Sequence, residues 1–200
     1  SALMKSSSST GGVNGSAVRV GRSVETYTPM NQREKGIGEA DYAVTDGRWI
    51  YTLSSKKKQY TVHIFQPDGK KTKEVQSILV PLPKDREGKR YKLYRSPIWE
   101  EYNAELYVSS NILTVVEEIQ GSLEWDIKTA AYFYDISDME HPKEIRHTIQ
   151  NGNYNTLREY NGILYLVTQQ AKVPVTAMKE ENKDRYIPGL DGELLGTQNI

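Results

Sequence analysis

The chain has 200 residues, 37% of them hydrophobic, and a mean hydropathy of −0.66, values that suit one half-buried β-rich domain. Its 26 Lys and Arg balance 26 Asp and Glu, which removes the electrostatic case for a nucleic acid or an anionic membrane as partner. With no cysteine and no run of 18 apolar residues, the sequence excludes disulfides, thiolate metal sites, cysteine nucleophiles and a membrane-spanning helix in these residues.

The first segment, residues 1–35, is too polar to bury a core. The run Ser6 to Ser9 and the pair Gly11-Gly12 are typical of a flexible tether. We expect ordered structure to begin near Ile37.

From Asp41 to Thr168 one pattern occurs three times: an apolar segment, a tight turn and a second apolar segment. The copies are AVTDGRWIYTLSS around Asp46-Gly47, ELYVSSNILTVVEEI around Ser109-Ser110, and LREYNGILYLVTQQ around Asn161-Gly162. The first two copies are each followed by another strand pair, YTVHIFQPDGKKTKEVQSI and TAAYFYDISDMEHPKEIRHTI. Two adjacent hairpins make a four-stranded meander, and such units repeated in sequence are typical of propeller blades.

The predicted fold class is therefore all-β. Residues 36–170 are expected to form antiparallel four-stranded meander blades, as the N-terminal part of a β-propeller with about two and a half blades. After Thr168 the periodicity ends, and residues 171–200, with Pro174 and Pro188, are predicted to be an irregular tail or a linker to further blades.

Several motifs resemble the secreted bacterial and archaeal β-propeller-domain family. GIGEADYAVTDGRWIYTLSS is similar to the opening of that family, YFYDISDMEHPKEI to a later motif, and LREYNGILYLVTQQ to its third-blade hairpin. The sequence departs from the family pattern at Gly38, where an Asp is usual, and at Ser109-Ser110, where Asp-Gly is frequent. The resemblance implies an extracellular or cell-envelope protein whose signal or anchor lies outside these residues and whose propeller continues past residue 200. The family has no established reaction or ligand.

The opening motif supplies two candidate ligand-binding residues, Glu39 and Asp41. On a structural interpretation, these carboxylates accept hydrogen bonds from nearby backbone donors. On a functional one, they line a channel mouth and bind a cation or a sugar hydroxyl, although one acidic pair supplies too few oxygens for a hard cation.

Tyrosine is abundant, with 14 Tyr and 3 Trp against 2 Phe, and most of these aromatic residues are expected to fill the core between sheets. Trp99 and Trp125 lie beside acidic residues at expected loop ends. We predict that these two side chains are exposed and can bind a polysaccharide or a peptide.

No catalytic set can be assembled from the sequence. His63 and His147 are expected on different strands and His141 in a turn, and no zinc, nucleophile-elbow or phosphate-loop spacing is present. The pairs Glu100-Glu101 and Glu117-Glu118 project to opposite strand faces, so neither can flank one glycosidic bond, and we expect solvated strand faces there. We assign no catalytic, cofactor-binding or metal-binding residue and expect no cofactor.

The turn from Asp135 to Asp138 raises the question of calcium. Its spacing lacks the oxygen density and the distal Glu of a calcium loop, so we expect ordinary side-chain-to-backbone turn bonds.

These observations favour a non-enzymatic binding or scaffold module with polysaccharide or protein partners at the cell surface. One alternative is a polysaccharide hydrolase or lyase with its catalytic residues on later blades. Another is an assembly module that self-associates through an open sheet edge.

Overall fold

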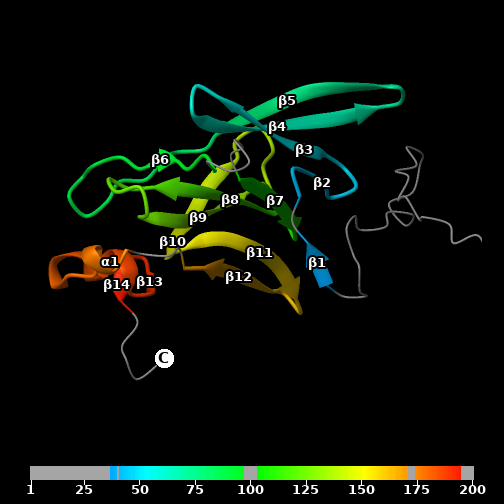
Figure 1. The fold of residues 1–200 in the computed structure, drawn as a ribbon. Helices are drawn as coiled ribbons and strands as arrows, with labels where there is room; N and C mark the ends of the chain where they lie inside the picture. The colour runs from blue at the N-terminus through cyan, green and yellow to red at the C-terminus, as the bar shows by residue number, and fades with distance from the viewer. Residues whose placement is uncertain (1–36, 40, 97–102, 171–173, 195–200) are drawn as a thin grey trace, which may run out of the picture.

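The computed structural model describes residues 37–39, 41–96, 103–170 and 174–194. These residues are almost entirely antiparallel β-structure, arranged as three sheets stacked in layers (Figure 1). The expected tether, residues 1–35, lies outside the described residues.

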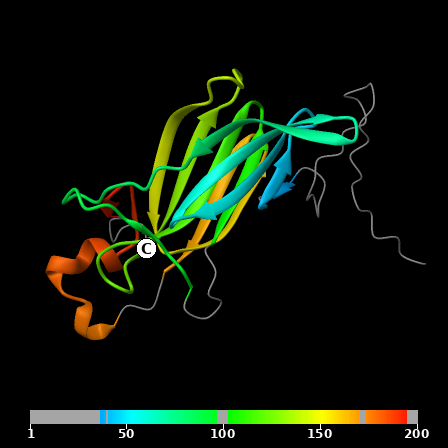
Figure 2. The ribbon, with the colours of Figure 1, turned by 90° about the horizontal axis from the view of Figure 1, so that it is seen from above.

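The first sheet is a four-stranded meander in chain order, as predicted for the first unit. Its turn between the second and third strands uses Lys57 and Lys58, both with positive φ, a geometry that matches the twist of a two-residue hairpin. Figure 2 shows its last two strands extending beyond the other sheets. The strands are β2 (Ala43–Thr45), β3 (Ile50–Lys56), β4 (Gln59–Asp68) and β5 (Lys71–Leu79).

The middle sheet contains the second predicted meander. Its tight turn is formed by Ser110 and Asn111, with φ of 49° and 62°, one residue later than the Ser109-Ser110 turn that we predicted. The shift follows from the pairing of Ser109 with Ile112, since Asn tolerates the left-handed region well. The strands are β6 (Lys92–Leu93), β7 (Ala104–Ser109), β8 (Ile112–Gln120), β9 (Ile127–Asp135) and β10 (Lys143–Asn151).

The third sheet contains the third predicted hairpin, β11 (Asn153–Tyr160) and β12 (Ile163–Gln169), joined at Asn161-Gly162 as expected. Its remaining strand is β1 (Ile37–Glu39), which pairs antiparallel with β11. A strand at the start of the described part of the chain therefore completes the sheet whose hairpin comes last in the sequence.

The segment from β1 to β2 joins all three sheets. β1 belongs to the third sheet, Asp41 exchanges two backbone hydrogen bonds of 2.9 and 2.7 Å with Leu106 of the middle sheet, and β2 begins the first sheet. The opening motif thus has a structural role that its sequence did not reveal, because its described residues pair with strands of all three sheets: β11 of the third, β7 of the middle and β3 of the first.

Within the predicted tail, residues 174–194 contain regular elements. A hairpin of β13 (Gly189–Leu190) and β14 (Glu193–Leu194) extends the middle sheet through pairing of Leu190 with Gln150. It is preceded by two 3-10 turns, η2 (Val175–Ala177) and η3 (Glu180–Asn182), and the single-turn helix α1 (Lys183–Tyr186). Periodicity cannot predict such short pieces, because their position depends on contacts with β10.

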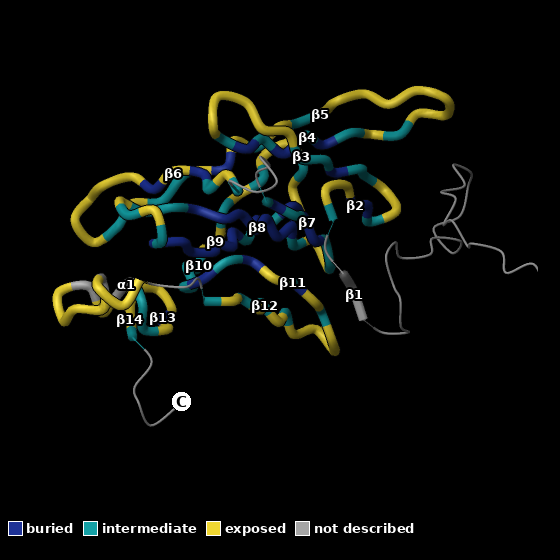
Figure 3. Tube along the Cα trace, in the orientation of Figure 1, coloured by how far each residue is buried: buried dark blue, intermediate teal, exposed yellow. Residues whose placement is uncertain are grey.

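The middle sheet is covered on both faces, as Figure 3 shows for β8 and β9. Odd-numbered residues of β8, such as Leu113 and Val115, pack with Tyr51 and Val62 of the first sheet. Even-numbered Val116 packs toward the third sheet. Because side chains alternate between the two faces of the sheet, β8 contributes to two separate hydrophobic cores, as expected for a blade packed between two others.

Aromatic residues fill these cores as predicted. Tyr51, Tyr60, Tyr107, Tyr132 and Tyr134 are all buried. Trp49 and Phe133 are half-buried against the cores. Phe65 departs from the prediction, because it lies on the outer face of the first sheet beside the His63 ring. Trp99 and Tyr102 lie outside the described residues.

Hydrogen bonds hold the middle and third sheets in register. Glu118 accepts the backbone N–H of Tyr154 at 2.7 Å, and the Tyr154 hydroxyl donates to Glu105 at 2.5 Å. The Tyr107 hydroxyl donates to Glu159 at 3.1 Å. The three sheets do not close into a ring, so the outer faces of the first and third sheets remain open within the described part of the chain.

Candidate functional site

The structure places the four predicted ligand-binding residues in separate settings. Glu39 pairs with Arg158 through the backbone of β1, and its side chain lies outside what is described. Asp41 lies beside Leu106, and its carboxylate accepts the Tyr42 N–H at 2.7 Å. Such a bond matches the structural interpretation of this residue.

The two tryptophans do not join these acids. Trp99 lies outside the described residues. Trp125 is half-buried in the loop between β8 and β9, whereas Asp41 lies at the edge of β7. The structure therefore brings Asp41 and Trp125 to different parts of the fold.

The turn from Asp135 to Asp138 forms side-chain-to-backbone bonds. Asp135 accepts the Ser137 N–H at 2.9 Å, a bond that lowers the pKa of its carboxyl. Asp138 bonds to the His141 side chain at 3.1 Å and accepts the Glu140 N–H at 3.0 Å, and these bonds, first the one with His141, lower the pKa of its carboxyl. Among the residues that the structure describes, no group of three or more acidic or histidine side chains could hold a metal ion.

Our expectation for Glu117-Glu118 is wrong in one respect. The two side chains do face opposite sides of β8, but both are buried rather than solvated. Glu117 points toward the first sheet, where it accepts the Tyr132 hydroxyl at 3.1 Å, and Glu118 points toward the third sheet. Burial on both faces occurs because β8 belongs to the middle sheet, which lies between the other two sheets. The pair Glu100-Glu101 lies outside the described residues.

Burial changes the ionisation of both carboxyls. It raises the pKa of Glu117 to about 8, against the opposing effect of the hydrogen bond from Tyr132. It also raises the pKa of Glu118, although hydrogen bonds that include those from Asn153 and the Tyr154 backbone oppose this. Both carboxyls accept hydrogen bonds from buried groups of neighbouring strands, which is a structural role.

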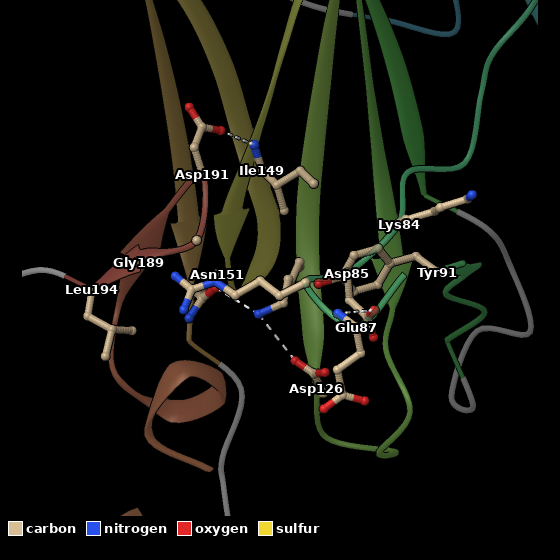
Figure 4. A pocket seen from close by; sticks show the side chains of 13 residues that line it. Lys84, Asp85, Glu87, Tyr91, Asp126, Ile149, Asn151, Gly189, Asp191 and Leu194 are labelled. Carbon is tan, nitrogen blue, oxygen red and sulfur yellow. Dashed lines mark hydrogen bonds and ion pairs between the residues drawn. The ribbon is translucent and has the colours of Figure 1, made fainter. Parts of the chain in front are cut away.

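The best candidate for a binding site is a pocket of about 160 Å³ at one end of the middle sheet, which we call the end pocket (Figure 4). It is smaller than the sites of drug-sized ligands, which take about 300 Å³ or more, and holds roughly five waters. Three separate segments form it: the connection that contains Lys84 to Tyr91, the adjacent ends of β9 and β10, and the β13–β14 hairpin.

A buried charged pair lies in the end pocket. Asp126 and Lys128, both over nine-tenths buried, approach with 3.3 Å between Oδ1 and Nζ, and the Lys128 ammonium donates to Asn151 Oδ1 at 2.9 Å (Figure 4). Asp126 Oδ1 is close enough for an ion pair, yet it accepts no hydrogen bond from the described residues. A buried carboxylate oxygen in this state is a strong acceptor for a hydroxyl or a water.

The other acids of the end pocket are already engaged. Asp85 accepts two backbone N–H groups of its own turn. Asp191 accepts the Ile149 N–H at 2.8 Å (Figure 4) and the Thr148 hydroxyl at 2.7 Å, and these bonds anchor the β13–β14 hairpin. Glu87 pairs with Lys89.

Arg86 is an exposed cation of the rim that can bind a ligand. The Arg86 guanidinium lies close to Gly192, since a Cβ added to Gly192 would be 3.0 Å from Arg86 Nε. Arg86 is exposed and makes no hydrogen bond or ion pair with the described residues. The end pocket therefore offers a buried acceptor, a buried ammonium and a free guanidinium around one small volume.

Sequence reasoning missed this site because its segments are distant in the chain. The one local signal is the spacing of Asp126 and Lys128, two residues apart at the start of an apolar strand, which puts both on one face. In addition, Lys128 pairs across the sheet with Asn151. The sequence does not reveal this contact, because it depends on the register in which β9 and β10 pair.

No helix in the described ranges has the length and apolarity needed to cross a membrane.

The chain is 29% identical over 161 residues to the uncharacterized protein MJ1554 of Methanocaldococcus jannaschii, and the match covers 80% of the chain but 20% of that relative. The chain thus spans about a fifth of the relative's length. No solved structure matches the chain significantly. The profile of the Beta propeller domain family matches residues 27–199, and the chain therefore belongs to this family.

Proposed function

We propose that this chain is part of a binding module of the cell envelope or the extracellular space, and that the end pocket binds one unit of a polar ligand without converting it. The observation that supports binding most directly is Asp126, whose buried Oδ1 lies beside the Lys128 ammonium and accepts no hydrogen bond from the described residues. The envelope location is supported by the resemblance to a secreted family, and protease accessibility on intact cells tests it.

The chemistry of the pocket favours a sugar, in particular an acidic one. A ring hydroxyl can donate to Asp126 while a ring or hydroxyl oxygen accepts from Lys128, and a carboxylate can pair with Arg86. The Arg86 side chain is exposed, so it is free to form such a pair at little cost of desolvation.

A single sugar should bind weakly. At about −0.3 kcal/mol per heavy atom, roughly 13 atoms give about −4 kcal/mol, which corresponds to a Kd near 1 mM. NMR titration with glucuronate and with glucose suits this range. We expect shifts at Asp126, Lys128 and Asn151 for both sugars, with glucuronate binding more tightly.

Variants separate the proposal from non-specific binding. Arg86→Ala should weaken glucuronate about 2- to 5-fold and leave glucose unchanged, because only the acidic sugar uses the guanidinium. Asp68→Asn, at the distant β4–β5 turn, is the control and should bind as the wild type. Shifts spread over the whole surface, or equal loss in both variants, would refute the site. Release of shorter sugars from a bound polysaccharide would instead support the hydrolase or lyase alternative.

A second candidate function is assembly with another copy of the chain. Tyr160, Ile163, Tyr165 and Val167 are about half exposed on the outer face of the third sheet. Exposed apolar residues that are contiguous on one sheet face indicate an interaction surface. Light scattering over rising concentration tests this: growth in mass that Tyr165→Lys abolishes supports assembly, and a strict monomer at every concentration counts against it.

A further inference from the structure

Three polar side chains form a hydrogen-bonded row across the outer face of the first sheet. Ser54 is on β3, His63 on β4 and Glu74 on β5. Ser54 Oγ lies 2.7 Å from His63 Nε2, and His63 Nδ1 lies 2.7 Å from Glu74 Oε1. Ser54 is exposed, and 28% of the His63 side chain and 46% of the Glu74 side chain are accessible, so a small molecule can reach all three.

When the His63 ring is neutral, these contacts allow one direction of hydrogen bonding. A carboxylate can only accept, so His63 Nδ1 donates its proton to Glu74. The neutral ring then has a lone pair at Nε2, which accepts the Ser54 hydroxyl proton. A carboxylate on Nδ1 and a serine on Nε2 is the arrangement that activates a serine nucleophile in unrelated hydrolases.

A backbone donor lies next to the serine. Leu53 N–H donates to Tyr42 O on the β2 side of β3 at 3.1 Å. Because antiparallel strands alternate their donors, Ser55 N–H points to that same side. Since β2 pairs with β3 only along Thr45 to Ala43, no residue of β2 lies opposite Ser55. Among the described residues no backbone group accepts this N–H, which lies one residue after the serine and can donate to an oxyanion formed at Ser54.

We propose that Ser54, His63 and Glu74 form a second site, independent of the end pocket, that hydrolyses small activated carboxylic esters. Ser54 Oγ attacks the ester carbonyl carbon while His63 Nε2 takes the hydroxyl proton. The carbon–oxygen bond to the leaving alcohol breaks, His63 returns the proton to that alcohol, and the acyl group remains on Ser54. Water, deprotonated by His63, then attacks the acyl carbon, and the carboxylic acid leaves as Ser54 regains its proton.

The roles of the three residues differ. Ser54 and His63 touch the reacting atoms. Glu74 acts through His63 as a positioning residue, because its carboxylate holds the ring with Nε2 toward the serine. The site lies on an open sheet face, so the expected substrate has a small acyl group and a good leaving group.

Hydrolysis of p-nitrophenyl acetate tests the site. Ser54→Ala and His63→Ala should each lower the rate by about 100-fold or to that of buffer, the scale expected when acid–base assistance to a nucleophile is lost. Ser77→Ala is the matched control, since Ser77 pairs across the sheet with His63 and its rate should equal that of the wild type. Glu74→Ala should lower kcat with little change in KM and remove the His63 Nδ1 proton signal from the NMR spectrum.

Covalent labelling separates this mechanism from catalysis by the imidazole alone. A fluorophosphonate should modify the peptide that contains Ser54 in the wild type and in Ser77→Ala, but not in Ser54→Ala. Label on Ser54 together with a Ser54-dependent rate supports the proposal. A rate that Ser54→Ala leaves unchanged, wild-type hydrolysis no faster than buffer, or label found only elsewhere would overturn it.

Discussion

Replacement of Glu117 by Gln should change how stability depends on pH. Glu117 is fully buried between the first and middle sheets, and burial raises the pKa of its carboxyl from 4.5 to about 8. Between these values the folded chain binds one more proton than the unfolded chain. The free energy of unfolding therefore falls as pH rises through this window, and the full stability is present only below about pH 4.5.

The magnitude follows from the size of the pKa change. At 1.36 kcal/mol per pH unit, a shift from 4.5 to about 8 corresponds to a loss of roughly 5 kcal/mol across the window. Gln cannot ionise and keeps an oxygen for the Tyr132 hydroxyl, but its unpartnered amide costs about 1 to 3 kcal/mol. The variant should thus be less stable than the wild type near pH 5 and more stable above pH 8.

Urea unfolding between pH 5 and 9 measures both free energies. The control is Glu124→Gln, since Glu124 is exposed in the loop after β8 and should leave the pH profile of the wild type intact. Parallel profiles for Glu117→Gln and the wild type, with no crossing, would refute the reasoning about Glu117.

Three further changes test the packing between sheets, each measured by urea unfolding. Glu118→Ala leaves the buried Tyr154 N–H without its acceptor and should cost about 1 to 3 kcal/mol, whereas a neutral result would mean that water replaces the carboxylate. Tyr154→Phe removes the hydroxyl that bonds to Glu105 of the middle sheet and should lower the free energy of unfolding by about 1 to 2 kcal/mol. An unchanged free energy of unfolding would show that this bond does not stabilise the fold. Gly152→Ala, at φ 103° with an added Cβ 2.7 Å from Gln169 O, should cost more than Gly162→Ala, at φ 77° in open space; equal costs would contradict the close approach.

The hairpins and the repeat could be predicted because their signals are local. The pair Asn161-Gly162 adopts positive φ at both residues, as a two-residue hairpin turn requires, and its flanking strands alternate apolar side chains. The same alternation on β8 correctly separated Glu117 from Glu118. What alternation could not show was that both faces of β8 would be covered, since this depends on two sheets distant in sequence.

Both candidate sites depend on the register between paired strands. Asp126 and Asn151 meet only because β9 and β10 pair in one register, and Ser54, His63 and Glu74 meet only across three strands. A bulge on β5 opposite Ile64 and Phe65 also shifts the position of Glu74 along the sheet. No spacing motif in the sequence encodes such a register, which explains why the search by motif found no site.

Hydrogen exchange of the native chain tests the stacking of the three sheets most directly. Because the middle sheet is covered on both faces, amides of β8 and β9 should exchange most slowly, while those of the β4–β5 hairpin, whose outer face is open, should exchange faster. Protection in β4 and β5 equal to or greater than that in β8 and β9 would contradict this arrangement.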